Sequence, residues 1–103
     1  MIIEAYAPVD CEDQEERENF YIDLEIISEK LKEELPNHKH MILGDMNAHV
    51  LRCYSNETNE NGELLLKLCR NRALTIVPLP GPTFIRGDTK SQVDYILLDN
   101  KNN

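Results

Sequence analysis

The sequence predicts an α/β fold, a partial α/β-sandwich with a mixed sheet and flanking helices. Two observations carry this prediction. Short apolar segments typical of strands alternate with two stretches of helical periodicity, and their order begins as a strand–helix–strand unit and ends in strands joined by a hairpin turn. A length of 103 residues suits one domain, and 41% hydrophobic residues suffice for a modest core.

A long amphipathic helix is expected between the first two strands. Asp13, three residues before Glu16, is typical of a capping box, and Pro36 predicts the helix end. The apolar residues recur at spacings of three and four, which places them on one helical face. These are Phe20, Leu24, Ile27, Leu31 and Leu35.

Five strands and a second helix complete the expected fold. The strands are expected over 1–7, 40–43, 74–77, 83–86 and 93–98. The helix is expected over 62–72, with Leu65, Leu68 and Cys69 facing the core. Gly87-Asp88 is typical of a hairpin turn between strands.

The charge distribution limits the function classes. The formal net charge of −8 lies within the first 40 residues, mainly on the expected long helix. Nucleic-acid coating and binding to anionic membranes are disfavoured, because both depend on clustered Lys and Arg. The half that carries Asp45, Asn47 and Asp94 is neutral overall, so a phosphodiester substrate is not excluded.

The sequence also predicts an intracellular location, nuclear or cytoplasmic. It shows neither a signal peptide nor an apolar run near the ~20 residues of a membrane span, so no membrane contact is expected. The odd number of scattered cysteines, Cys11, Cys53 and Cys69, favours reduced thiols.

The segment HMILGDMNAHV is the first candidate site. An apolar strand precedes Gly44, which permits a sharp exit, and Asp45 and Asn47 follow at the carboxyl end of the strand, where ligands bind in open α/β sheets. The i, i+2 spacing points both side chains to one side. There a carboxylate can activate water or contact a metal, and an amide can bind a phosphate oxygen. Locally, a polar turn that caps the strand is an alternative.

Two further polar residues join this candidate site. Tyr6 ends the first strand in EAYAP, and Asp94 lies among apolar residues in SQVDYILL. A carboxylate inside so apolar a strand must be paired or functional, because burying it unpaired is costly. Alternatively, Tyr6 is a half-buried strand aromatic and Asp94 caps a neighbouring turn.

Taken in order, these segments resemble a known family. EAYAP, an amphipathic helix, MILGDMNAH, NENGELLLKLCRNRALTIV, PTFIRG and SQVDYILL resemble the endonuclease/exonuclease/phosphatase superfamily. They are most similar to endonuclease domains of LINE-type retrotransposons, in which G-D-F-N-A-H, N-x-x-G-x-x-L, P-T-F and S-x-I-D-Y recur in this order. The resemblance extends from about residue 2 to residue 98.

The resemblance implies a role for each matching residue. Tyr6 would lie against the scissile phosphate, and Asp45 would activate the attacking water and contact the metal. Asn47 would hold the phosphate, and Asp94 would orient a catalytic histidine. Asn61, Gly62 and Thr83 would shape the site. The implied cofactor is Mg²⁺ and the implied partner is DNA.

This sequence departs from the family pattern at both ends. The family's early Asn and metal-binding Glu are not matched, and no S-D-H segment supplies the catalytic histidine. We therefore expect residues 1–103 to form one partial endonuclease-like domain that is catalytically crippled. The substrate class, DNA, RNA or a smaller phosphate ester, and the oligomeric state are not predicted.

Two other hypotheses remain open. The chain could be a non-catalytic interaction protein whose acidic helix, with Glu15, Glu18, Glu25 and Glu29, is the binding surface. Alternatively, the three histidines could bind zinc, although no carboxylate or thiol accompanies them at zinc-like spacing. These are His38, His40 and His49.

Overall fold

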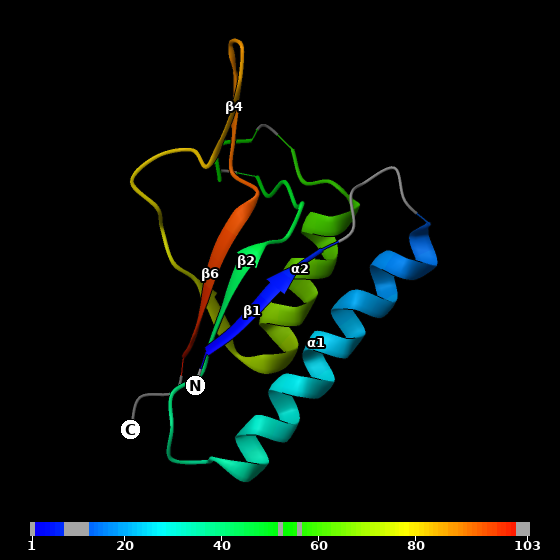
Figure 1. The fold of residues 1–103 in the computed structure, drawn as a ribbon, viewed down its shortest axis with the longest axis vertical. Coiled ribbons are helices and arrows are strands. Elements are labelled where there is room, and N and C mark those ends of the chain that lie inside the picture. Colours follow the sequence, from blue (N-terminus) through cyan, green and yellow to red (C-terminus); the bar gives the residue numbers. More distant parts are fainter. Residues whose placement is uncertain (1, 8–12, 52, 56, 101–103) are drawn as a thin grey trace.

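The computed structural model describes residues 2–7, 13–51, 53–55 and 57–100. The elements in chain order are β1 (Ile2–Tyr6), α1 (Gln14–Glu34), β2 (Met41–Asp45), α2 (Glu60–Arg72), β3 (Leu74–Ile76), β4 (Phe84–Arg86), β5 (Thr89–Ser91) and β6 (Asp94–Asp99). The predicted mixed α/β class is confirmed (Figure 1).

The main sheet has four strands in the order β1-β2-β6-β3. β1 and β2 are parallel, and α1 connects them along the chain, so the predicted strand–helix–strand unit is confirmed. β6 pairs antiparallel with both β2 and β3. The sheet is therefore mixed, and β2 and β6, where Asp45 and Asp94 lie, are its two central strands.

The hairpin near the carboxyl end differs from the prediction. β4 pairs with β5, forming a separate two-stranded sheet that projects beyond the main one (Figure 1). β5 was not expected, because Thr89-Lys90-Ser91 is polar and gives no strand pattern. Gly87 makes the turn with a φ of +60°, a conformation that glycine adopts without strain.

Both helices pack on one face of the main sheet (Figure 1). Alternate strand residues point to that face and meet buried side chains of the two helices. The central members of this core are Ile42 and Leu97 from the sheet, Leu24 from α1, and Leu65 and Leu68 from α2.

Helix α1 begins and ends as predicted, but its buried face is rotated. The Asp13 side chain caps the helix by accepting from the Glu15 amide, and the helix ends at Glu34, two residues before Pro36. Ile27, expected in the core, is 44% exposed. The buried positions are Arg17, Tyr21, Leu24 and Ser28.

Polar contacts explain this rotation. Arg17 is buried because it pairs with Glu60 in the first turn of α2. Tyr21 is buried because its hydroxyl donates to the Met46 carbonyl, at 2.9 Å. The spacing of apolar residues does not reveal either of these polar contacts.

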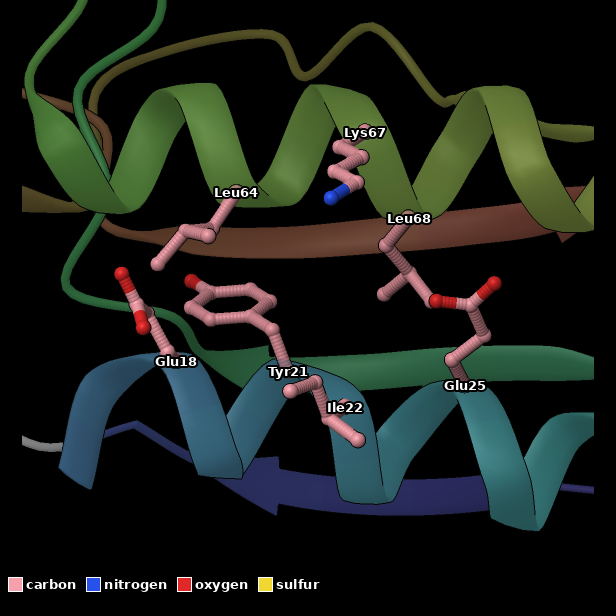
Figure 2. Close-up of a pocket in the computed structure, with 7 residues that line it drawn as sticks. All are labelled: Glu18, Tyr21, Ile22, Glu25, Leu64, Lys67 and Leu68. Carbon is pink, nitrogen blue, oxygen red and sulfur yellow. The ribbon is translucent and has the colours of Figure 1, made fainter. Parts of the chain in front are cut away.

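A hollow of about 240 Å³ lies between the two helices. Figure 2 shows Tyr21 pointing from α1 toward α2, with Leu64 and Leu68 pointing back. Glu18 and Glu25 from α1 and Lys67 from α2 border it, so part of the acidic helix faces α2. None of the helices that the structure describes is both long and apolar enough to cross a membrane.

Candidate active site

Three of the predicted site residues form a row across neighbouring strands. The register places Tyr6 beside Asp45, and Asp45 beside Asp94. Side chains at one register position point to the same face of a sheet, about 5 Å from one another. Core residues such as Ile42, Tyr95 and Leu97 point to the helices, so this row lies on the other face. We call Tyr6, Asp45 and Asp94 the polar row.

The members of the polar row differ in exposure. Tyr6 is 78% exposed, so its ring and hydroxyl are open to a ligand. Asp45 and Asp94 are partly buried. Asp94 is the first residue of β6, so it belongs to the apolar strand in which it was expected, at the end of that strand.

Gly44 lets β1 and β2 approach closely just before the polar row. A Cβ atom at this position would lie 1.9 Å from the Ala5 carbonyl oxygen, and the φ of +146° is unfavourable for any L-residue. The glycine of the G-D-x-N segment is therefore required for the strand pairing that brings Tyr6 beside Asp45.

Asp45 and Asn47 are linked in a tight local turn. The Asp45 carboxylate accepts from the Asn47 backbone N–H at 2.9 Å, and Asn47 has a φ of +45°. The Asn47 side-chain amide donates to the Ala7 carbonyl at 2.7 Å. The amide therefore ties the end of β1 to this turn, and it retains a second N–H for a ligand.

Thr83 has the structural role that was expected for it. Its hydroxyl oxygen accepts from the backbone N–H groups of Val93 and Asp94, at 3.0 and 3.1 Å. Its own backbone N–H donates to the Ser91 carbonyl. Thr83 thus joins the hairpin to the start of β6 and fixes the backbone at Asp94.

Two buried tyrosines hold the segment after β2. The Tyr95 hydroxyl donates to the Ala48 carbonyl at 2.9 Å, and the Tyr21 hydroxyl donates to Met46 two residues earlier. Burial, with a smaller contribution from nearby Cys53, raises the pKa of Tyr95, so its hydroxyl remains a donor. Sequence reasoning missed these tyrosines as positioning residues, although Tyr95 directly follows Asp94.

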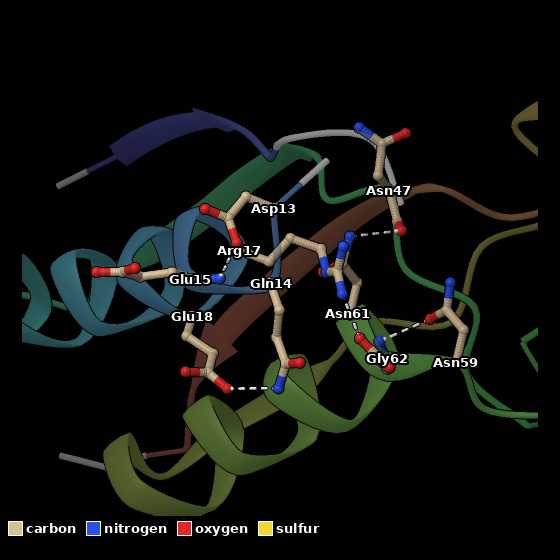
Figure 3. A network of polar contacts seen from close by, with 10 residues as sticks. Asp13, Gln14, Glu15, Arg17, Glu18, Asn47, Asn59, Asn61 and Gly62 are labelled. Atoms are coloured by element: carbon tan, nitrogen blue, oxygen red, sulfur yellow. Dashed lines mark hydrogen bonds and ion pairs between the residues drawn. The ribbon is translucent and has the colours of Figure 1, made fainter. Parts of the chain in front are cut away.

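The amino end of α2 also forms hydrogen bonds with the segment after β2. The Asn59 side chain caps the helix by accepting from the Gly62 N–H, 2.8 Å away (Figure 3). The same side chain also accepts from the His49 N–H. Asn61 donates to the Asn47 carbonyl at 3.0 Å. A Cβ atom at Gly62 would lie 2.1 Å from the His49 carbonyl oxygen. The N-E-N-G sequence therefore shapes the site.

A cavity of about 330 Å³ adjoins the polar row on the side of the hairpin. Residues of β4 and β5 and of the segment after β2 line this cavity. The contribution of β5 was not predicted from the sequence, because β5 gives no strand pattern. The lining residues are Asp45, Asn47, His49, Phe84, Thr89, Ser91 and Val93.

The described residues do not fit a complete metal site. Asp45 and Asp94 are neighbours in register and offer hard oxygen ligands. However, within residues 2–7, 13–51, 53–55 and 57–100, no three His, Cys, Asp or Glu side chains gather to hold an ion. The zinc hypothesis therefore fails for His38, His40 and His49, all of which lie in these ranges.

Comparison with known proteins places the chain in a family. A family model described as "Endonuclease-reverse transcriptase" matches residues 1–103. Among solved structures, the endonuclease domain of TRAS1, a telomere-specific non-LTR retrotransposon, has a similar fold, with a TM-score of 0.59 and 24% identity. The match covers 77% of this chain and 38% of that chain, so this chain spans well under half of the relative. No curated protein matches in a sequence search. The chain belongs to the endonuclease–reverse transcriptase family of the endonuclease/exonuclease/phosphatase superfamily.

Proposed function

We propose that this chain carries part of the active site of a metal-dependent, retrotransposon-type DNA endonuclease, and that it does not cleave DNA unaided. The observation that carries the proposal is the polar row. Residues from three strands that are distant in sequence share one register position on one face of the sheet.

Each residue has a role that its chemistry suits. The exposed Tyr6 hydroxyl would donate to a phosphodiester oxygen, and the second N–H of the Asn47 amide would donate to another. Asp45 is already oriented by the Asn47 backbone N–H and would accept a proton from the attacking water. Asp94, fixed through Thr83, would orient an imidazole in the required tautomer.

Magnesium would neutralise charge on the phosphate and on the leaving oxygen. Asp45 would supply one oxygen ligand, but Mg²⁺ needs near-octahedral coordination, and one carboxylate is a poor anchor. The described residues supply no third ligand, so no reaction step is assigned to the ion. The proposed lack of activity follows from this incomplete ligand set.

A plasmid nicking assay tests the proposed inactivity. The purified chain is incubated with supercoiled plasmid and Mg²⁺, and relaxed circles are quantified beside those from an Asp45→Ala variant. We expect no difference between the two, because neither holds a complete metal site. Mg²⁺-dependent nicking by the wild-type chain that disappears in Asp45→Ala would overturn the proposed inactivity.

A further inference from the structure

The segment after β2 alternates strictly between buried and accessible residues. Met46, Ala48 and Val50 are at most 6% exposed, whereas Asp45, Asn47 and His49 are partly exposed. The accessible members all line the cavity of about 330 Å³. His49 therefore continues the line that Asp45 and Asn47 begin, on the side away from Tyr6.

The backbone of His49 is held independently of its side chain. Its N–H donates to the Asn59 side chain at 2.9 Å, and its carbonyl accepts from the Asn59 N–H at 3.0 Å. Gly62 packs against that carbonyl with no room for a Cβ atom. Within the described part of the chain, the imidazole itself forms no hydrogen bond, so no hydrogen bond of the ring stabilises the fold.

The lining of the cavity suits an anion with an extended backbone. The His49 imidazole, the Asn47 amide and the Thr89 and Ser91 hydroxyls can all donate hydrogen bonds. Phe84 and Val93 provide an apolar wall against which a sugar or base can pack. Asp45 provides the one carboxylate, at the end of the cavity nearest the polar row.

We propose that His49 binds the phosphate next to the scissile one, so that the cavity is a second phosphate subsite for a nucleic-acid strand. This proposal rests on the proposed function, because it takes the polar row as the position of the scissile phosphate. The imidazole N–H donates to a non-bridging oxygen of the neighbouring phosphate. His49 is therefore a substrate-binding residue that fixes the register of the strand.

The test compares variants of His49 with a matched histidine control. Binding of a short fluorescein-labelled DNA duplex to the chain is measured by anisotropy at fixed pH and salt. His49→Ala should weaken binding roughly tenfold, as expected for a lost hydrogen bond to a charged group. His49→Gln, which keeps a donor, should recover most of that loss. His38→Ala, at an exposed position outside the cavity, should bind as the wild type does.

Three outcomes separate the possibilities. If His49→Ala unfolds at the same urea concentration as the wild type but binds more weakly, and Gln restores binding, the subsite is supported. If wild type and His49→Ala bind DNA equally, the subsite is wrong while the proposed function stands. If the wild-type chain binds no DNA, both the subsite and the proposed function are contradicted.

Discussion

Two tyrosine hydroxyls fix the backbone that presents the candidate site. Tyr21 and Tyr95 donate to the carbonyls of Met46 and Ala48, residues that are 0% exposed. A buried carbonyl that loses its donor retains the full cost of desolvation. These two hydrogen bonds from the core therefore fix the backbone on either side of Asn47, and next to Asp45 and His49.

Tyr95→Phe should therefore destabilise the fold by about 1–3 kcal/mol, because the Ala48 carbonyl loses its donor while the ring still packs. Urea denaturation followed by circular dichroism measures this loss. Tyr6→Phe is the matched control, because its hydroxyl is exposed and its loss should leave the unfolding midpoint unchanged. Equal midpoints for both variants would contradict the assigned role of Tyr95.

Burial also controls the reactivity of Cys69. Cys53 and Cys69 are free thiols, and Cys11 lies outside the described residues. Burial raises the pKa of Cys69 from 9.0 to about 11, although nearby Arg70 opposes the shift. Because the thiolate is the reactive form, iodoacetamide should modify Cys69 slowly at pH 8 and rapidly once urea unfolds the chain. Mass spectrometry of peptides sampled over time measures both rates.

The same shift predicts a pH dependence of stability. The folded state binds the thiol proton more tightly than the unfolded state does. The stabilising contribution of Cys69 is therefore complete below pH 9 and is lost as the pH rises toward 11. Cys69→Ala should flatten this part of the stability–pH profile. A profile between pH 9 and 11 that is identical in the variant would contradict the assignment.

At the scale of single elements, the close pairing of β1 and β2 depends on Gly44. Gly44→Ala should unfold the chain or cost several kcal/mol, because its Cβ atom would meet the Ala5 carbonyl oxygen at 1.9 Å. Gly81→Ala is the control, since a Cβ atom there meets nothing within 4 Å. Thermal denaturation should separate the two variants clearly. A Gly44→Ala protein as stable as Gly81→Ala would mean that β1 is not paired as described.

The elements show which parts of the fold the sequence reveals. The periodicity of apolar residues and the strand patterns predicted the four strands of the main sheet and both helices, because burial of apolar side chains determines those elements. The rotation of α1 was missed because Arg17 and Tyr21 are buried by polar contacts with partners distant in sequence. β5 was missed because its residues are polar, with Thr89 and Lys90 exposed, and it is held by pairing with β4.

The same distinction applies to the candidate site. Tyr6, Asp45, Asn47 and Asp94 were predicted by residue type and by resemblance, and the register brings three of them into one row. The cavity beside the row could not be predicted, because it depends on how the β4–β5 hairpin sits over the segment after β2.

For the molecule as a whole, the two faces of the main sheet differ. The helices cover one face, and neither helix covers the other (Figure 1). The open face carries partly exposed apolar side chains beside the polar row, namely Met41, Leu43, Ile96 and Leu98, with Ile2 at 61% exposure.

Two adjacent residues of β6 should therefore respond differently to truncation. Leu97→Ala removes a side chain that is 0% exposed and should cost about 2–5 kcal/mol. Ile96→Ala on the open face should cost less than half as much and should reduce the binding of an apolar dye such as anilinonaphthalene sulfonate. Urea denaturation and dye fluorescence measure the two effects. Equal losses of stability would contradict the assignment of faces.

The central proposal is that the polar row of this chain is part of an endonuclease active site. A chimera tests it most directly: the part of this chain that matches the TRAS1 endonuclease domain, 77% of its residues, replaces the corresponding segment of that domain. If circular dichroism shows a folded chimera, we expect Mg²⁺-dependent nicking of supercoiled plasmid that Asp45→Ala or Asp94→Ala reduces by at least about a hundredfold. A folded chimera that nicks no DNA, or that nicks equally well with both carboxylates removed, would contradict the claim.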